Sequence, residues 1–308
     1  ILNGEDTGDS HVVWSNGLDY QIGDRVYVEK FVDQGQSYYF LNEKIRGLEI
    51  ISSIIIFAIV VVLLFGKKGI KSIASLVVSG IIIFAVLMPL TLQGYNPILI
   101  SSVISILLLT SMIFITNGFN RLSYSAILGC SIAVLITIIL SSIVITFTDI
   151  SGKVDELASY VNYLNTKYIN FSAIVISSMI IGVIGAVDDG AVTQASVVQQ
   201  LKITDPSLST LELYKRAMHV GRDHAGAMIN TLILAYVSSS IPLFLSLYLA
   251  PVPLYILINQ ESISLEIFRA TIGSIGLLLA IPITTWVSIY LLDKKSHNHS
   301  TKLYHHHH

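Results

Sequence analysis

Charged side chains are scarce in this sequence. Asp, Glu, Lys and Arg make up 12% of its 308 residues, against about 25% in soluble domains. Hydrophobic residues reach 53%, and they gather in long runs. This composition indicates an integral membrane protein, with the lipid bilayer as its first partner. The net charge of −2 leaves no basic surface for a polyanion, so we expect no nucleic-acid partner.

Cysteine is nearly absent as well, because Cys130 is the only one. A single thiol forms no disulfide within the chain and no cysteine-based metal site. His219 and Asp223 lie four residues apart, on one face of a helix, and His224 follows them. Their spacing matches no named zinc motif. We therefore favour an ordinary helix terminus there over a metal site, and we expect no metal and no cofactor.

Apolar runs are what the sequence has in abundance. Seven stretches are each long enough to cross the hydrocarbon layer, at 48–65, 70–89, 97–116, 123–146, 171–197, 225–249 and 267–291. We therefore expect an all-α polytopic membrane bundle over residues 46–296, with about seven transmembrane helices. An N-terminal anchor upstream of residue 1 is also expected, and it would make eight.

Residues 1–45 follow a different pattern. Short β-type runs at 12–14, 25–28 and 38–40 are separated by turn residues, among them Asp33-Gln34-Gly35. They predict a small β module at 1–45, ahead of the transmembrane domain. Residues 297–308 form a tail that ends in a run of His, which we interpret as the remnant of a purification tag.

Lysine and arginine are distributed unevenly between the two sides of the predicted bundle. The loops on one side hold Lys67, Lys68, Lys71, Arg121, Lys202, Lys215, Arg216, Arg222, Lys294, Lys295 and Lys302. The short loops on the other side hold only Lys153 and Lys167. Because cytoplasmic loops carry the excess of cations, the first side faces the cytoplasm. We expect the β module to lie outside and the C-terminus to lie in the cytoplasm.

Two loops are predicted to contain helices of their own. Apolar residues recur at helical spacing over 154–164, which favours an amphipathic helix on the outer surface. In the inner loop, Ser209 and Glu212 have the spacing of a capping box at the start of a helix.

Two adjacent acids, Asp188 and Asp189, interrupt the run 171–197. An acid at the centre of a membrane helix costs about 2.5–3.5 kcal/mol, so the pair indicates a function. A straight helix from Ser172 reaches Asp188 after about 24 Å, in the cytoplasmic half of a core about 30 Å thick. Neighbouring residues point about 100° apart, so the two acids have different neighbours. The alternative is a pair at a helix end that reaches the membrane interface.

Small residues flank the acids and recur in the last span. Glycine lets helices approach closely, and it also permits a locally unwound helix whose carbonyl groups face an ion. Proline in the last span predicts a kink. The expected packing or hinge positions are Gly182, Gly185, Gly190, Gly273, Gly276 and Pro282.

The start of the following span supplies possible partners for the acids. Asn230 lies about 8 Å inside Ala225 at the helical rise, a depth close to that of Asp188. Asn230 and Thr231 are therefore expected to complete a polar site with one of the acids. Arg222, beside Asp223, would tune the acid's affinity for protons or bind an anionic lipid head group.

Stretches spread over nearly the whole chain carry a family resemblance. They lie at 22–26, 117–120, 180–187 with the acid that follows, 221–223, 230–236 and 273–284. These stretches resemble the YibE/F-like family of bacterial multi-span membrane proteins. The resemblance implies a polytopic protein with an N-terminal anchor and an extracytoplasmic β module. The usual family pattern has one acid where this chain has Asp188 and Asp189.

A second resemblance is local. Residues 185–192, the polar inner helix and the Thr-containing span are similar to the proton-relay region of resistance-nodulation-division exporters and SecD/SecF proteins. In those families intramembrane acids carry protons that drive an extracytoplasmic domain. The large porter domains of the exporters are missing here and the number of spans differs, so this resemblance suggests proton coupling only.

Three functions remain for comparison. The leading hypothesis is a transporter or permease coupled to protons or a cation, with an unknown ion or small solute as substrate. The alternative is a non-transporting accessory or assembly protein whose β module binds a partner. An intramembrane enzyme is disfavoured, because an aspartyl protease needs two acids that meet across a shared proton and adjacent acids diverge. Faces rich in small residues permit a homo-oligomer.

Overall fold

The structure is a computed structural model that describes residues 13–14, 17, 19–21, 23–33, 36–153, 170–249 and 252–304. The predicted amphipathic helix at 154–164, the first residues of the β module and the terminal His run lie outside the described residues. The chain divides into two compact units, Ile1–Ile70 and Lys71–His308. The helix predicted to cross the membrane first therefore belongs to the same unit as the β module.

The first unit contains a small sheet and one helix. Strands β1 (Val13–Trp14), β2 (Val26–Asp33) and β3 (Gln36–Lys44) are ordered β1-β3-β2, with β2 antiparallel and β1 parallel to β3. Asp33 pairs with Gln36, so the hairpin reverses where the turn was predicted. The β module is confirmed. Helix α1 (Gly47–Phe65) follows at once, and none of its residues is buried.

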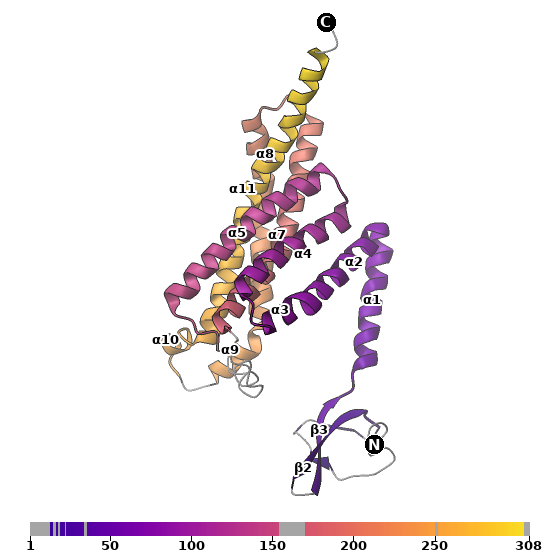
Figure 1. Cartoon of the computed structure of the whole chain (residues 1–308), viewed down its shortest axis with the longest axis vertical. Helices are drawn as coiled ribbons and strands as arrows, with labels where there is room; N and C mark the ends of the chain where they lie inside the picture. The colour runs from indigo at the N-terminus through magenta and orange to yellow at the C-terminus, as the bar shows by residue number, and fades with distance from the viewer. Residues whose placement is uncertain are drawn as a thin grey trace. The chain divides into compact units, whose positions relative to one another are not determined.

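The second unit is helical. Its helices are α2 (Lys67–Ile82, which begins in the first unit), the π-helical turn Ile83–Leu87, α3 (Met88–Leu92), α4 (Pro97–Asn117), α5 (Arg121–Thr148), α7 (Phe171–Thr204), α8 (Thr210–Ser239), α9 (Ile241–Tyr248), α10 (Leu254–Leu257) and α11 (Glu261–Tyr304) (Figure 1). Within the described residues, six helical stretches are long and apolar enough to cross a membrane. The all-α polytopic class is confirmed.

The predicted span at 225–249 is not among these six. Helix α8 begins far earlier, at Thr210, and ends at Ser239, where a turn at Ser240 separates it from α9. The apolar stretch is therefore split, and its first part carries Arg222 and Asp223. Helix α8 nevertheless runs back along α7, because Tyr236 lies beside Gly182 whereas the carbonyl of Ala217 binds Gln194.

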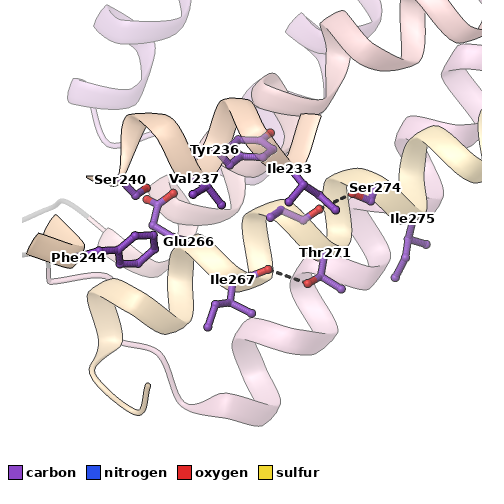
Figure 2. Close-up of a pocket in the computed structure, with 11 residues that line it drawn as sticks. Ile233, Tyr236, Val237, Ser240, Phe244, Glu266, Ile267, Thr271, Ser274 and Ile275 are labelled. Carbon is purple, nitrogen blue, oxygen red and sulfur yellow. Dashed lines mark hydrogen bonds between the residues drawn. The ribbon is translucent and has the colours of Figure 1, made fainter. Parts of the chain in front are cut away.

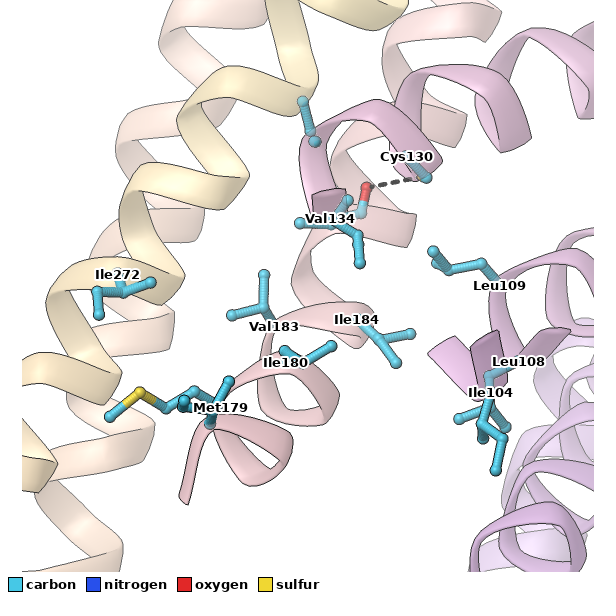
Figure 3. Packing of buried hydrophobic residues seen from close by; sticks show 14 of the residues in the cluster. Ile104, Leu108, Leu109, Cys130, Val134, Met179, Ile180, Val183, Ile184 and Ile272 are labelled. Atoms are coloured by element: carbon cyan, nitrogen blue, oxygen red, sulfur yellow. Dashed lines mark hydrogen bonds between the residues drawn. The ribbon is translucent and has the colours of Figure 1, made fainter. Parts of the chain in front are cut away.

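Helices α5, α7 and α11 pack against one another at the centre of the second unit, with α4 against α5 and α7, and α8 against α7 and α11 (Figure 1). Branched side chains of α7 fill the space between these helices, as Figure 3 shows. Buried members of this core include Leu108, Leu109, Val134, Met179, Ile180, Val183, Ile184 and Ile272. The continuous apolar runs of the sequence therefore serve as both core and bundle surface.

Side-chain caps fix where several helices begin. The carboxamide oxygens of Asn96, Asn120 and Asn170 accept hydrogen bonds from backbone amides at the starts of α4, α5 and α7. The predicted capping box is confirmed, because Ser209 Oγ accepts from the amide of Glu212 and Glu212 Oε2 accepts from the amide of Ser209, each at 3.3 Å.

The connection after α5 is tied to the start of α11. The Glu261 carboxylate accepts hydrogen bonds from Ser151 Oγ at 3.0 and 3.1 Å and from the amide of Gly152. Gly152 has a φ of 71°, in the region that favours glycine. Ser172 in the first turn of α7 donates to the carbonyl of Ile150 at 2.8 Å. The ends of α5, α7 and α11 therefore meet here.

Candidate functional site

Asp188 and Asp189 lie on an unbroken helix. Helix α7 is continuous from Phe171 to Thr204, so the flanking glycines do not unwind it. Asp188 is half-buried and Asp189 is exposed, and the two side chains diverge as adjacent helical residues must. The structure thus gives the two acids different surroundings.

The Asp188 carboxylate is partly buried, and it forms no ion pair among the described residues. Its Oδ1 atom is buried, and it has no hydrogen-bond partner among the described residues. Val187 and Gly190 beside it are both buried. Cys130 of α5 donates a weak hydrogen bond from Sγ to the Val187 carbonyl at 3.5 Å, so α5 is the helix next to this turn of α7 (Figure 3). A buried carboxylate in such a place is a group that a proton or a cation would satisfy.

Asp189 lies on a different face of α7. Gly182, Gly185, Asp189 and Thr193 recur at helical spacing and are all exposed. Gly182 is also close to α8, because a Cβ atom built on it would lie 2.8 Å from Tyr236 Oη. The exposed acid therefore belongs to a stripe of small and polar residues that follows the edge of α7 beside α8.

Contacts between α7 and α8 establish which residues share a level. Gly182 lies beside Tyr236, and a Cβ atom on Gly190 would lie 3.8 Å from Met228 Cε. The same antiparallel register places Asn230 level with Asp188. The two residues are nevertheless not joined, because among the described residues no hydrogen bond or ion pair connects Asp188 to α8.

The other predicted members of the polar site are on the surface of α8. Arg222, Asp223, Asn230 and Thr231 are all exposed. Thr231 Oγ1 donates to the carbonyl of Ala227 in its own helix at 3.0 Å. His219 is exposed too, and within the described part of the chain no three His, Cys, Asp or Glu residues gather as a metal site would need.

The predicted packing positions divide into two kinds. Cβ atoms built on Gly182, Gly190, Gly273 and Gly276 would meet neighbouring helices at 3.2 Å or less, and the tightest approach would be from Gly276 to Thr137 Oγ1. A Cβ atom on Gly185, in contrast, would have no neighbour within 4 Å. Pro282 lies inside α11, and the helix continues past it.

Sequence reasoning missed a buried amide that joins three helices. Gln194 of α7 is 2% exposed. Its Nε2 atom donates to the Ala217 carbonyl of α8 at 3.0 Å and to Thr285 Oγ1 of α11 at 2.8 Å. A Cβ atom on Gly221 would lie 2.7 Å from Gln194 Oε1, so glycine leaves room for the amide. An uncharged amide in an apolar run was the only signal in the sequence.

A second set of polar groups lies farther along the bundle, toward α9. Arg269 of α11 pairs with Glu266 at 2.5 Å and donates from Nη2 to Ser178 Oγ of α7 at 3.3 Å. The two residues are three apart in the same helix, a spacing that brings their side chains together. Two atoms nearby, Tyr236 Oη and Glu266 Oε2, are buried and have no hydrogen-bond partner among the described residues.

Comparison with known proteins agrees with this architecture. The family model described as YibE/F-like protein matches residues 53–294. A search of curated proteins and a search of solved structures each found no match. These findings do not support the resemblance to resistance-nodulation-division exporters or SecD/SecF proteins. The family match extends over most of the chain and includes every helix that forms the core, and the chain therefore belongs to the YibE/F-like family.

Proposed function

We propose that this protein is a transporter or permease of the bacterial inner membrane, in which Asp188 binds and releases the coupling proton or cation. The observation that carries the proposal is the buried, unpaired Oδ1 atom of Asp188. An isolated carboxylate is costly to bury unless it is neutralised or paired. Acids inside membrane helices accordingly mark ion pathways and proton relays.

Asp189 has a separate role in this proposal. It lies on the exposed stripe of α7 with Gly182, Gly185 and Thr193, next to the helix that carries Asn230. This stripe is the route by which an ion or a small solute reaches the level of Asp188. Asn230 and Thr231 supply uncharged polar groups at that level, and Arg222 lies closer to the cytoplasmic end of α8.

The proposal includes the membrane orientation that was predicted from the lysine and arginine residues of the loops. The β module faces the outside and the C-terminus faces the cytoplasm. The partners are the bilayer, the transported species and a second copy of the chain, since exposed glycines permit close helix contacts. Absence of an enzymatic activity stays a prediction.

Flux measurements on reconstituted protein test the proposal. Wild type, Asp188→Asn and Asp189→Asn are placed in liposomes that contain a pH-sensitive dye, and proton, Na⁺ and K⁺ gradients are applied in turn. Asp188→Asn should abolish the flux that wild type supports, because an amide takes up neither a proton nor a cation in the same way. Asp189→Asn is the matched neighbour and should retain measurable flux. Equal flux from wild type and Asp188→Asn would refute the role of Asp188.

An accessory role is the second candidate, and the edge of the sheet favours it. Strand β2 is at the edge, and its Tyr27, Phe31 and Val32 side chains are each 62% exposed. Exposed apolar residues on an edge strand are typical of a surface that another chain covers. In this role Asp188→Asn would lower thermal stability and Phe31→Ser would release a partner. A stable Asp188→Asn protein that has lost flux would count against it.

A further inference from the structure

A cavity opens between α8, α9 and α11, away from Asp188 and toward α9 (Figure 2). Its volume is about 390 Å³, at the lower end of the range of about 300–1,000 Å³ found for small-molecule sites. Apolar side chains from three helices form most of its wall, and Ile233, Val237, Phe244 and Ile267 are among them. The cavity therefore has the size and the lining of a site for one small lipophilic molecule.

The mouth of the cavity faces the surface of the bundle. The side chains at its rim are partly exposed: Ile233 is 39%, Val237 41%, Ile267 46% and Ile275 38% exposed. All four are branched and apolar, and they lie on helices of a membrane bundle. This apolar rim favours the entry of an apolar molecule.

Two polar atoms of residues that line the cavity, Glu266 Oε2 and Tyr236 Oη, are buried without a hydrogen-bond partner among the described residues. Glu266 Oε1 binds Arg269, whereas Glu266 Oε2 is buried and unpaired among the described residues. The nearby hydroxyls of Thr271 and Ser274 are already used, because each donates to a carbonyl of its own helix at 2.7 Å (Figure 2). A carboxylate oxygen only accepts hydrogen bonds. A group that satisfies Glu266 Oε2 must therefore be a donor, and the Tyr236 hydroxyl can donate to that group in return.

We propose that this cavity binds a single-chain amphiphile from the bilayer, whose hydroxyl or ammonium head group donates a hydrogen bond to Glu266 Oε2. The volume of about 390 Å³ matches a single alkyl chain. A hydroxyl can donate to Glu266 Oε2 and accept from Tyr236 Oη, whereas a deprotonated anionic head group has no proton to donate to the carboxylate. This site is separate from Asp188, and its existence does not depend on the proposed transport.

Equilibrium binding to protein in lipid nanodiscs tests the proposal. The probe is tritiated dodecan-1-ol, with tritiated dodecanoate as the anionic control of equal chain length. Empty nanodiscs measure simple partition into lipid. Wild type should show one saturable equivalent of the alcohol above partition and none of dodecanoate. Glu266→Gln should raise the apparent Kd for the alcohol by about tenfold, because a charge-assisted hydrogen bond is lost.

Variants that fill the cavity complete the test. Ala270→Phe places a ring in the cavity wall and should remove saturable binding. Thr271→Phe does the same from an exposed position, which protects the test against a misfolded Ala270→Phe protein. Leu245→Phe, on the exposed face of α9 and outside the cavity, is the matched control and should bind like wild type. Saturable binding that survives both filling variants would overturn the site. Equal binding of alcohol and dodecanoate would overturn the role of Glu266.

Discussion

The hydroxyl of Tyr236 in α8 lies against Gly182 of α7, where a Cβ atom would come within 2.8 Å of the Tyr236 oxygen. A Cβ atom on Gly273 of α11 would lie 3.6 Å from the same oxygen. One tyrosine therefore occupies a notch made by two glycines from two different helices. The approach of α8 to α7 and α11 at this level depends on these missing side chains.

Gly182→Ala should destabilise the protein because the tyrosine must move. We expect a loss of about 1 kcal/mol in the free energy of unfolding, the lower end for an overpacked site, since the far end of a side chain can turn aside. Urea unfolding in detergent measures it. Gly185→Ala, where no neighbour lies within 4 Å of the new atom, should be neutral or slightly stabilising. Adding Tyr236→Phe should rescue Gly182→Ala, because the clashing oxygen is then absent. An equal loss in the double variant would contradict the notch.

Gln194→Leu should cost about 0.5–1.5 kcal/mol of stability, because the Ala217 carbonyl loses the hydrogen bond from Gln194 and keeps only the one within its own helix. Thr285 keeps a hydrogen bond to the carbonyl of Ile281 at 2.7 Å, so most of the loss falls on the contact with α8. The same unfolding experiment measures it. Gln200→Leu, at an exposed position of the same helix, is the matched control and should change stability by less than about 0.5 kcal/mol. Equal losses in the two variants would show that the three-helix junction contributes nothing.

Gly152→Ala should be more damaging than Gly118→Ala. Both glycines have positive φ, 71° and 77°, so each substitution incurs a backbone strain of about 1–3 kcal/mol. Only at Gly152 would the new Cβ atom also meet backbone, at 2.6 Å from the carbonyl of Phe171. The difference between the two melting temperatures isolates this clash. Similar melting temperatures of the two variants would mean that the segment at Gly152 can shift away from Phe171 at no cost in stability.

The β module should loosen in acid through one carboxylate. A hydrogen bond from the Gln21 amide and, second, the Lys44 ammonium at 2.6 Å hold the pKa of Asp24 below its ordinary value. A depressed pKa contributes stability above the unfolded value, and this contribution is lost as the pH falls through the folded value, below about pH 4. Hydrogen exchange of β2 and β3 amides, corrected for intrinsic rates, should therefore accelerate there. Asp24→Asn should remove that acceleration, and a variant that retains it would assign the effect to another group.

Much of the fold follows from local patterns. Six of the predicted spans correspond to long apolar helices, and the hairpin turn at Asp33 and the capping box at Ser209 are where local rules place them. The span at 225–249 was predicted wrongly in its extent, because periodicity does not reveal that α8 starts at Thr210 or that a turn at Ser240 ends it. The bounds of α8 depend on its packing against α7 and α11, which the local sequence pattern does not reveal.

The candidate site was predictable in part. Two charges within an apolar run identify Asp188 and Asp189 without a structure. Which of them is enclosed depends on the rotation of α7 about its axis, and only tertiary contacts such as Cys130 to Val187 fix that rotation. Gln194 and Glu266 carry no local signature of their roles, since their partners lie on α8, on α11 or on no described residue.

Helices α7 and α11 are fastened to each other at two separated points. Arg269 reaches Ser178 near one end, and Gln194 reaches Thr285 near the other. Two fastenings along parallel helices suppress both sliding and rotation of one against the other. We therefore expect α7 and α11 to move together as one rigid pair, with Asp188 located between the two contacts. In the transport cycle proposed above, a rearrangement that opens the Asp188 carboxylate to each side of the membrane would come from helices outside this pair, such as α4 or α5.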